Sequence, residues 1–173
     1  MPTITRLSAA ELRASAKELA DLLVDAVNGG ASLGFVSPFG HDAAAAWWEE
    51  LAPAVADGRR LIWAARSGDR LTGTVSLALE PKPNAPHRAE IAKLVVHRDA
   101  RGQGLGRRLL AAAEEAATVA GRTLLLLDTE SGSAAEYLYR SAGWTEIGVV
   151  PDHAALPSGP LRPTTFFYKS LGK

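Results

Sequence analysis

Residues 94 to 110 combine the glycines and arginines that suit a binding site for pyrophosphate. A β-branched run ending at Val96 is followed by Arg101-Gly102-Gln103-Gly104-Leu105-Gly106, and an amphipathic helical pattern begins at once. Glycines let a tight turn bring backbone N–H groups close to a ligand, and a helix N-terminus adds unpaired donors with partial positive charge. Arg107 and Arg108 add full charges beside that of Arg101. The segment therefore predicts a pyrophosphate cradle.

The spacing within this loop separates the possible kinds of phosphate site. A dinucleotide fingerprint counted from Gly102 would need a third glycine where Arg107 stands, and a P-loop would need lysine followed by serine or threonine. The pattern that fits is R-x-x-G-x-G after a strand. A second motif follows downstream, since residues 135 to 144 read A-x-x-L-Y-x-x-x-G-W.

These two motifs, at this spacing, resemble the GCN5-related N-acetyltransferases (GNAT). The resemblance implies that acetyl-CoA is the cosubstrate and that the loop amides hold its pyrophosphate. The cofactor-binding residues that it implies are Leu94, Val95, Val96, Arg101, Gly102, Gln103, Gly104, Leu105, Gly106 and Arg107. Many family members carry asparagine where this chain has Gly132, so the contacts around the distal pantetheine arm are left open.

Within that family, the chain is similar to tabtoxin-resistance-type acetyltransferases. The segments that carry this likeness are 29–35, 89–94, 127–129, 135–139 and 165–169. The likeness implies an acceptor amine on a small, amino-acid-like or antibiotic-like molecule.

Acetyl transfer to an amine needs a base, because a lysine-like amine with a pKa of ~10.4 is mostly protonated at neutral pH. Glu90 lies in the strand that leads to the loop, and strict alternation would place Glu90, Ala92, Leu94 and Val96 on one face. Apolar neighbours would then raise its pKa. The alternative is a carboxylate that faces water or pairs with Arg88. The family resemblance implies that Glu90 is the base.

Asp128 ends the apolar run from Leu124, where ligands of open α/β sheets bind. It could instead form a turn or cap the helix that follows Ser131. The resemblance implies a second base or an anchor for the acceptor ammonium.

Tyr139 shares a helical face with Ala135 and Ala142. It could be a core tyrosine, whereas the resemblance implies a general acid for the departing thiolate. The resemblance also implies that backbone N–H groups near Leu94 and Val96 stabilise the oxyanion.

Three aromatic residues are candidates for an acceptor pocket. They are Phe35, Trp47 and Trp48, and adjacent tryptophans on a helix usually divide into one core residue and one that covers a groove. The four histidines have no metal-ligand spacing, so we expect no metal site.

Hydrophobic periodicity and turn residues predict the elements that must position these groups. We expect strands at 4–7, 61–65, 71–79, 89–96, 123–127, 144–150 and 164–169. We expect helices from a capping box at Ser8 and Glu11 to Asn28, from Asp42 to Pro53, and at 104–120 and 134–142. Pro151 to Pro163 should be a loop. The order predicts one α/β domain, 1–173, of GNAT-like fold: a mixed, mostly antiparallel sheet with one parallel strand–helix–strand unit and helices on both faces.

Composition narrows the function further. The 173 residues have 19 basic and 19 acidic side chains, so no global positive charge attracts nucleic acid or an anionic membrane. The absence of cysteine excludes disulfides and an acetyl-cysteine intermediate, which favours direct transfer. Residues 1–13 show no secretory signal, which predicts a cytoplasmic protein.

We therefore expect an acetyl-CoA-dependent N-acetyltransferase that acts on a small-molecule amine. Two alternatives stay open: a protein or peptide N-acetyltransferase on the same fold, and a non-catalytic acyl-CoA-binding module. Exposed edge strands leave room for a homodimer.

Overall fold

The computed structural model describes residues 1–172, which form one seven-stranded sheet with the strand order β1-β2-β3-β4-β5-β7-β6. Only β4 and β5 run parallel, and the other neighbours are antiparallel. The strands are β1 Thr3–Arg6, β2 Arg60–Ser67, β3 Arg70–Leu79, β4 Arg88–Val96, β5 Leu124–Glu130, β6 Thr145–Ala155 and β7 Leu161–Ser170. The predicted mixed sheet with one parallel unit is confirmed.

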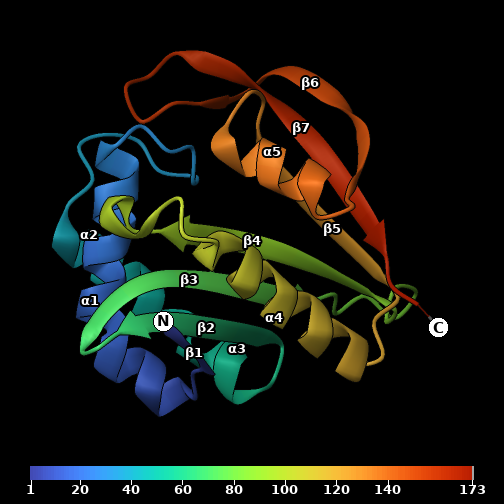
Figure 1. Cartoon of the computed structure of the whole chain (residues 1–173), viewed down its shortest axis with the longest axis horizontal. Helices are drawn as coiled ribbons and strands as arrows, with labels where there is room; N and C mark the ends of the chain where they lie inside the picture. The colour runs from blue at the N-terminus through green and yellow to red at the C-terminus, as the bar shows by residue number, and fades with distance from the viewer. Residues whose placement is uncertain (173) are drawn as a thin grey trace.

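Helices cover both faces of this sheet (Figure 1). One face carries α1 Ala9–Asn28, α2 His41–Glu49 and α3 Ala52–Ala56, and the other carries α4 Leu105–Val119 and α5 Ala134–Ser141. The predicted capping box is present, since the backbone N–H of Glu11 donates to Ser8 Oγ at 3.1 Å and that of Ser8 donates to Glu11 Oε2 at 2.7 Å. Helix α2 begins two residues earlier than predicted, with Gly40 rather than Asp42 as its cap.

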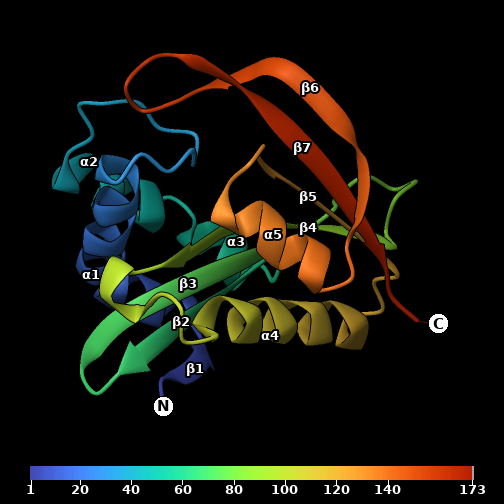
Figure 2. The ribbon, with the colours of Figure 1, turned by 45° about the horizontal axis from the view of Figure 1, so that its top comes forward.

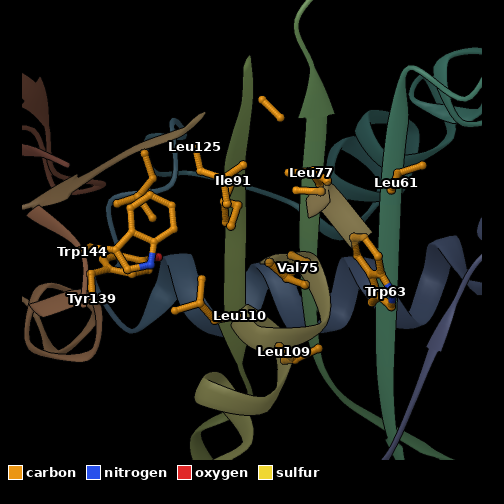
Figure 3. Close-up of a cluster of buried hydrophobic side chains, with 14 of the residues drawn as sticks. Leu61, Trp63, Val75, Leu77, Ile91, Leu109, Leu110, Leu125, Tyr139 and Trp144 are labelled. Atoms are coloured by element: carbon orange, nitrogen blue, oxygen red, sulfur yellow. The ribbon is translucent and has the colours of Figure 1, made fainter. Parts of the chain in front are cut away.

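Each face of the sheet has its own hydrophobic core. The core under α4 and α5 contains Trp63, Leu77, Ile91 and Leu109, and Figure 3 shows Leu109 and Leu110 of α4 against β3 and β4. The other core packs α1 and α2 on the opposite face around residues such as Trp48. None of the helices described within residues 1–172 is long and apolar enough to span a lipid bilayer.

A β-bulge in β4 reverses which way its side chains point. Thr74 pairs with Val95 but Ser76 pairs with Ala92, so two residues of β4 oppose one of β3. Lys93 lies in this bulge with φ of +54°. The predicted alternation is therefore wrong: Ala89 and Ile91 lie in the α4 core, and so do Leu94 and Val96, while Glu90 and Ala92 face the α1 side.

Strands β4 and β5 are paired only at their beginnings. Their register runs from Arg88 opposite Leu124 to Glu90 opposite Leu126, and no pair follows. Strand β5 continues along β7 up to Glu130, so β4 and β5 diverge at the bulge. This divergence opens the sheet beside the cradle.

The predicted loop at Pro151 to Pro163 is wrong, because β6 and β7 extend through most of it as a hairpin. Strand β6 accommodates Pro151 in an irregular register between Val150 and Ala154, where Asp152 has φ of +50°. The hairpin arches towards the loop between α1 and α2 (Figure 2). There the N–H of Ser37 donates to the carbonyl of Pro157 at 2.8 Å.

Candidate active site

The cradle has the backbone geometry that the glycine pattern predicts. Gly102 and Gly104 have φ of +76° and +77°, a region that L side chains rarely adopt. Helix α4 starts at Gly104 without a side-chain cap, and Arg108 makes the first backbone hydrogen bond, to the carbonyl of Gly104 at 3.2 Å. The N–H groups of the first turn are therefore free to bind an anion.

A cleft of about 450 Å³ passes from this cradle through the opening between β4 and β5. Its walls come from the end of α1 and the loop after it, from β4, from the start of α4, and from the start of α5. All but one of the predicted cofactor-binding residues line it: Leu94, Val95, Val96, Arg101, Gly102, Gly104, Leu105, Gly106 and Arg107. Gln103 does not, and its side-chain amide donates to the carbonyl of Asp99 at 3.5 Å.

The three arginines of the loop have different positions. Arg101 Nε donates to the carbonyl of Val96 at 3.0 Å, and Arg107 donates to Ser141 Oγ, which joins α4 to the end of α5. Arg108 was expected at the cradle, but it donates to the carbonyl of Pro2 at 2.9 Å. Full positive charge at the cleft therefore comes from Arg101 and Arg107.

Glu90 lies on the α1 side of the opening, and Asp128 follows on the same side of β5. Glu90 is opposite Leu126, and Leu125 and Leu127 point into the α4 core, so Leu126 and Asp128 face the other way. Both carboxylates reach solvent. Desolvation by the surrounding protein raises the pKa of Glu90, and the charge of Asp128 raises it further.

Glu90 does face water, as one of its alternatives required, but the other alternative roles of these two carboxylates do not fit the structure. Arg88 pairs with Glu80 at 3.0 Å rather than with Glu90. Asp128 belongs to β5, opposite Phe166, and Ser133 caps α5 by accepting from the N–H of Glu136 at 3.3 Å. Both carboxylates thus remain available to a ligand.

Tyr139 is on α5, on the opposite side of the opening from Glu90. Its side chain is 6% exposed and packs against Trp144 and Phe167, with ring centroids 6.0 and 6.1 Å apart (Figure 3). Within residues 1–172 its hydroxyl makes no hydrogen bond. Burial and, to a smaller extent, the charge of Asp128 raise the pKa of this hydroxyl, so it keeps its proton at neutral pH.

The sequence analysis missed two cations on the α1 side of the opening. Arg60 of β2, Ala78 of β3 and Glu90 of β4 form one row across the sheet, and burial lowers the pKa of Arg60. Burial also lowers the pKa of Lys93, with a smaller effect from Arg60. Among the described residues, none of Arg60, Glu90, Lys93 and Asp128 has an oppositely charged partner within 4.0 Å. The bulge that places Lys93 here depends on the pairing of β3 with β4, which the sequence pattern does not reveal.

Aromatic side chains close this side. Phe35 stacks on Phe39 at 4.3 Å and meets the edge of Trp47 at 5.4 Å. Lys93 Nζ lies 5.6 Å from the ring centroid of Phe35 and 5.5 Å from that of Trp47. Trp48 is 0% exposed, so it is a core residue and its predicted contact with the acceptor is wrong.

The end of β5 and the start of α5 add a wall that the sequence analysis did not assign. Thr129, Glu130, Ser133, Ala134, Ala135 and Leu138 line the cleft. Gly132, in the position where many family members carry asparagine, has φ of +81°, and its N–H donates to the carboxylate of Glu136. Within residues 1–172 no group of three or more histidine, aspartate or glutamate side chains could hold a metal ion.

Comparisons with known proteins agree with this geometry. The model of the acetyltransferase (GNAT) family matches residues 24–144. The structure of yncA from Salmonella typhimurium, solved with its cofactor acetyl-CoA, superimposes with a TM-score of 0.79 at 22% identity and covers 100% of this chain and 95% of that one. An N-acetyltransferase from Staphylococcus aureus Mu50 gives a TM-score of 0.82 at 16% identity, covering 99% of each chain.

A third structure is a ribosomal-protein-alanine N-acetyltransferase from Brucella melitensis. It has a TM-score of 0.76 and 26% identity, and the match covers 98% of this chain and 99% of that one. The family match spans the cradle, the bulge and the helix that carries Tyr139. The chain belongs to the GNAT acetyltransferase family.

Proposed function

We propose that this protein transfers the acetyl group of acetyl-CoA directly to the amino group of a small, amino-acid-like molecule. The observation that carries the proposal is the opening between β4 and β5. The anion-binding cradle and Tyr139 lie on the α4 side of it, which we call the cofactor side. Two unpaired carboxylates and an aromatic wall lie on the α1 side, which we call the acceptor side. Two substrates that enter from opposite faces can meet there.

The cofactor side would bind acetyl-CoA through backbone groups. The free N–H groups at the start of α4 suit its pyrophosphate, and Arg107 adds charge beside them. Past the bulge, the N–H of His97 donates to the carbonyl of Thr72 in β3. Since successive backbone groups of a strand alternate, the N–H of Val96 points away from β3 into the opening. It would stabilise the negative oxygen of the tetrahedral intermediate.

Glu90 would take a proton from the acceptor ammonium, directly or through water, because its raised pKa brings it closer to the pKa of the amine. Tyr139 would donate a proton to the departing thiolate. Its hydroxyl has no competing hydrogen bond in the described part of the chain and stays protonated at neutral pH. Asp128 would attract the cationic acceptor and hold the pKa of Glu90 up.

The charges on the acceptor side favour a small molecule with both an amine and an anionic group. Glu90 and Asp128 suit the amine, and Arg60 and Lys93 suit a carboxylate. The loop and the hairpin joined by Ser37 and Pro157 restrict this side, which favours a small acceptor over a protein chain. A non-catalytic module is disfavoured, because it would not need a base and an acid at the two ends of one opening.

The test is acetyl-CoA-dependent thiol release against matched amines. Amino acids should be acetylated faster than their decarboxylated amines, polyamines and peptides with a free N-terminus. Release with peptides alone would favour the protein acetyltransferase alternative. Binding of acetyl-CoA without amine-dependent release across the panel would contradict the proposal.

A further inference from the structure

Lys93 places a primary amine on the α1 side of the opening, directly before Leu94, which lines the cleft. Its side chain is half-buried, and Nζ lies over the rings of Phe35 and Trp47. Within residues 1–172, Nζ has no hydrogen-bond partner and no carboxylate within 4.0 Å. Contact with ring faces contributes only about 0.5–2 kcal/mol, so this side chain can leave the two rings and turn towards the cleft.

The surroundings of Lys93 favour its reactive form. Burial and the charge of Arg60 lower its pKa, although Asp128 and Glu90 oppose part of this effect. A larger fraction of Lys93 is therefore neutral than of a lysine with the ordinary pKa of ~10.4. Only the neutral amine has a lone pair for attack on a thioester.

The backbone places this amine at the opening itself. Lys93 is the bulge residue with φ of +54°, and its neighbour Leu94 lines the cleft on the cofactor side. Glu90 precedes it by three residues, and the negative charge of Glu90 raises the pKa of Lys93. The amine and the candidate base thus belong to the strand that borders the opening, and the residue after Lys93 lines the cleft in which the thioester would lie.

We propose that Lys93 is an internal acetyl acceptor, which the enzyme modifies when acetyl-CoA is bound and no amine substrate is present. The inference rests on the proposed function, because it uses the same cofactor, cleft and base. Nζ forms a C–N bond to the acetyl carbon as the C–S bond breaks. The nitrogen loses its proton to Glu90, and the sulfur takes one from Tyr139.

The modification would limit the enzyme's own activity. Acetyl-Lys93 is a neutral amide, so one of the two cations that face the acceptor is lost, and the added group occupies space next to Phe35 and Trp47. Modified enzyme should show a several-fold higher KM for an anionic amine than for its decarboxylated analogue. Acetyl-CoA in excess over acceptor would then reduce turnover.

Incubation of the full chain with acetyl-CoA alone, followed by intact mass and peptide mapping, tests this inference. We expect one acetyl group on Lys93, added at least about tenfold faster than to the exposed residues Lys17 and Lys82, because Lys93 borders the cleft in which the thioester would bind. The rate at Lys93 should fall about 10²-fold in Glu90→Gln. Lys93→Arg keeps the charge and should take up no rapid acetyl group.

The controls separate this inference from the proposed function. Unfolded chain reports non-enzymatic acetylation, and the same folded preparation is assayed with the amine panel. Acetylation of Lys93 no faster than Lys17, or equally fast in the unfolded chain, overturns the inference. Unmodified Lys93 in an enzyme that acetylates amines overturns the inference and leaves the proposed function intact. Unmodified Lys93 together with no amine turnover contradicts both.

Discussion

Glu90 and Leu94 belong to the same strand and are four residues apart, yet they face opposite sides of the sheet. A regular strand would place them on the same side, and the bulge at Lys93 separates them. Glu90 consequently faces α1 with the aromatic wall, and Leu94 faces α4 with the cradle. One inserted residue thus divides the opening into an acceptor side and a cofactor side.

The pH dependence of catalysis should depend on Glu90. Its raised pKa means that the base form is lost as pH falls, at a higher pH than for an ordinary glutamate with a pKa of ~4.3. Glu90→Gln should lower kcat/KM by about 10²-fold. It should also abolish the fall of kcat/KM at low pH, which is the acidic limb of the pH profile. Binding of acetyl-CoA, measured by calorimetry, should change little. A wild-type pH profile in Glu90→Gln would reject Glu90 as the base.

Asp128→Asn should shift the acidic limb of the kcat/KM profile along the pH axis rather than abolish it. Asp128 raises the pKa of Glu90, so its neutralisation should lower that pKa and shift the acidic limb of kcat/KM to lower pH. KM for the acceptor should rise, because one carboxylate no longer attracts the ammonium. A limb at unchanged pH would show that the two carboxylates do not interact.

Tyr139→Phe tests the acid without changing the packing. The ring stays between Trp144 and Phe167, and no hydrogen bond within residues 1–172 is lost. We expect kcat to fall by at least about tenfold, with unchanged thermal stability and acetyl-CoA affinity. Unchanged kcat with a thiol leaving group would make Tyr139 a core residue only.

Gly104→Ala should weaken acetyl-CoA binding beyond its effect on stability. An alanine with φ of +77° costs about 1–2 kcal/mol. Gly121 at the other end of α4 is a matched control, since its φ is +74° and neither glycine has an atom within 4 Å of an added Cβ. Both variants should unfold at lower denaturant concentration, and only Gly104→Ala should raise the Kd for acetyl-CoA. Equal Kd values would argue against the cradle.

The adjacent tryptophans should separate stability from acceptor binding. Trp48→Ala removes a fully buried side chain and should lower the free energy of unfolding by about 3–5 kcal/mol. Trp47→Ala should lower the free energy of unfolding less than Trp48→Ala does. It should raise KM for the acceptor, because Trp47 faces Lys93 and Phe35. Denaturant titration and initial rates check the pair. The reverse assignment of effects would contradict the acceptor wall.

Local patterns were sufficient to predict the cradle and most elements. Ser8 and Glu11 determine the start of α1 through two hydrogen bonds between them. Gly102 and Gly104 have positive φ angles, which favour glycine. Such features depend on neighbours in the sequence. Pro151 and Pro163 were misleading, because proline is tolerated at irregular positions and at an edge strand of a hairpin.

The acceptor side could not be predicted in the same way, because it depends on register between distant strands. Arg60 comes beside Glu90 only through the pairings of β2, β3 and β4. The face of Glu90 depends on a bulge that the hydrophobic pattern of 89–96 does not reveal. Phe39 joins the wall through the fold of the loop before α2.

The most direct measurement of the central claim is a crystal structure of the protein with coenzyme A and an acetylated amino acid bound together. The account predicts coenzyme A on the α4 side, with its pyrophosphate at Gly102 to Gly106. It predicts the acetyl oxygen near the N–H of Val96 and the amide nitrogen on the side of Glu90. Both ligands on one face of the sheet, or an amide nitrogen remote from Glu90 and Asp128, would contradict it.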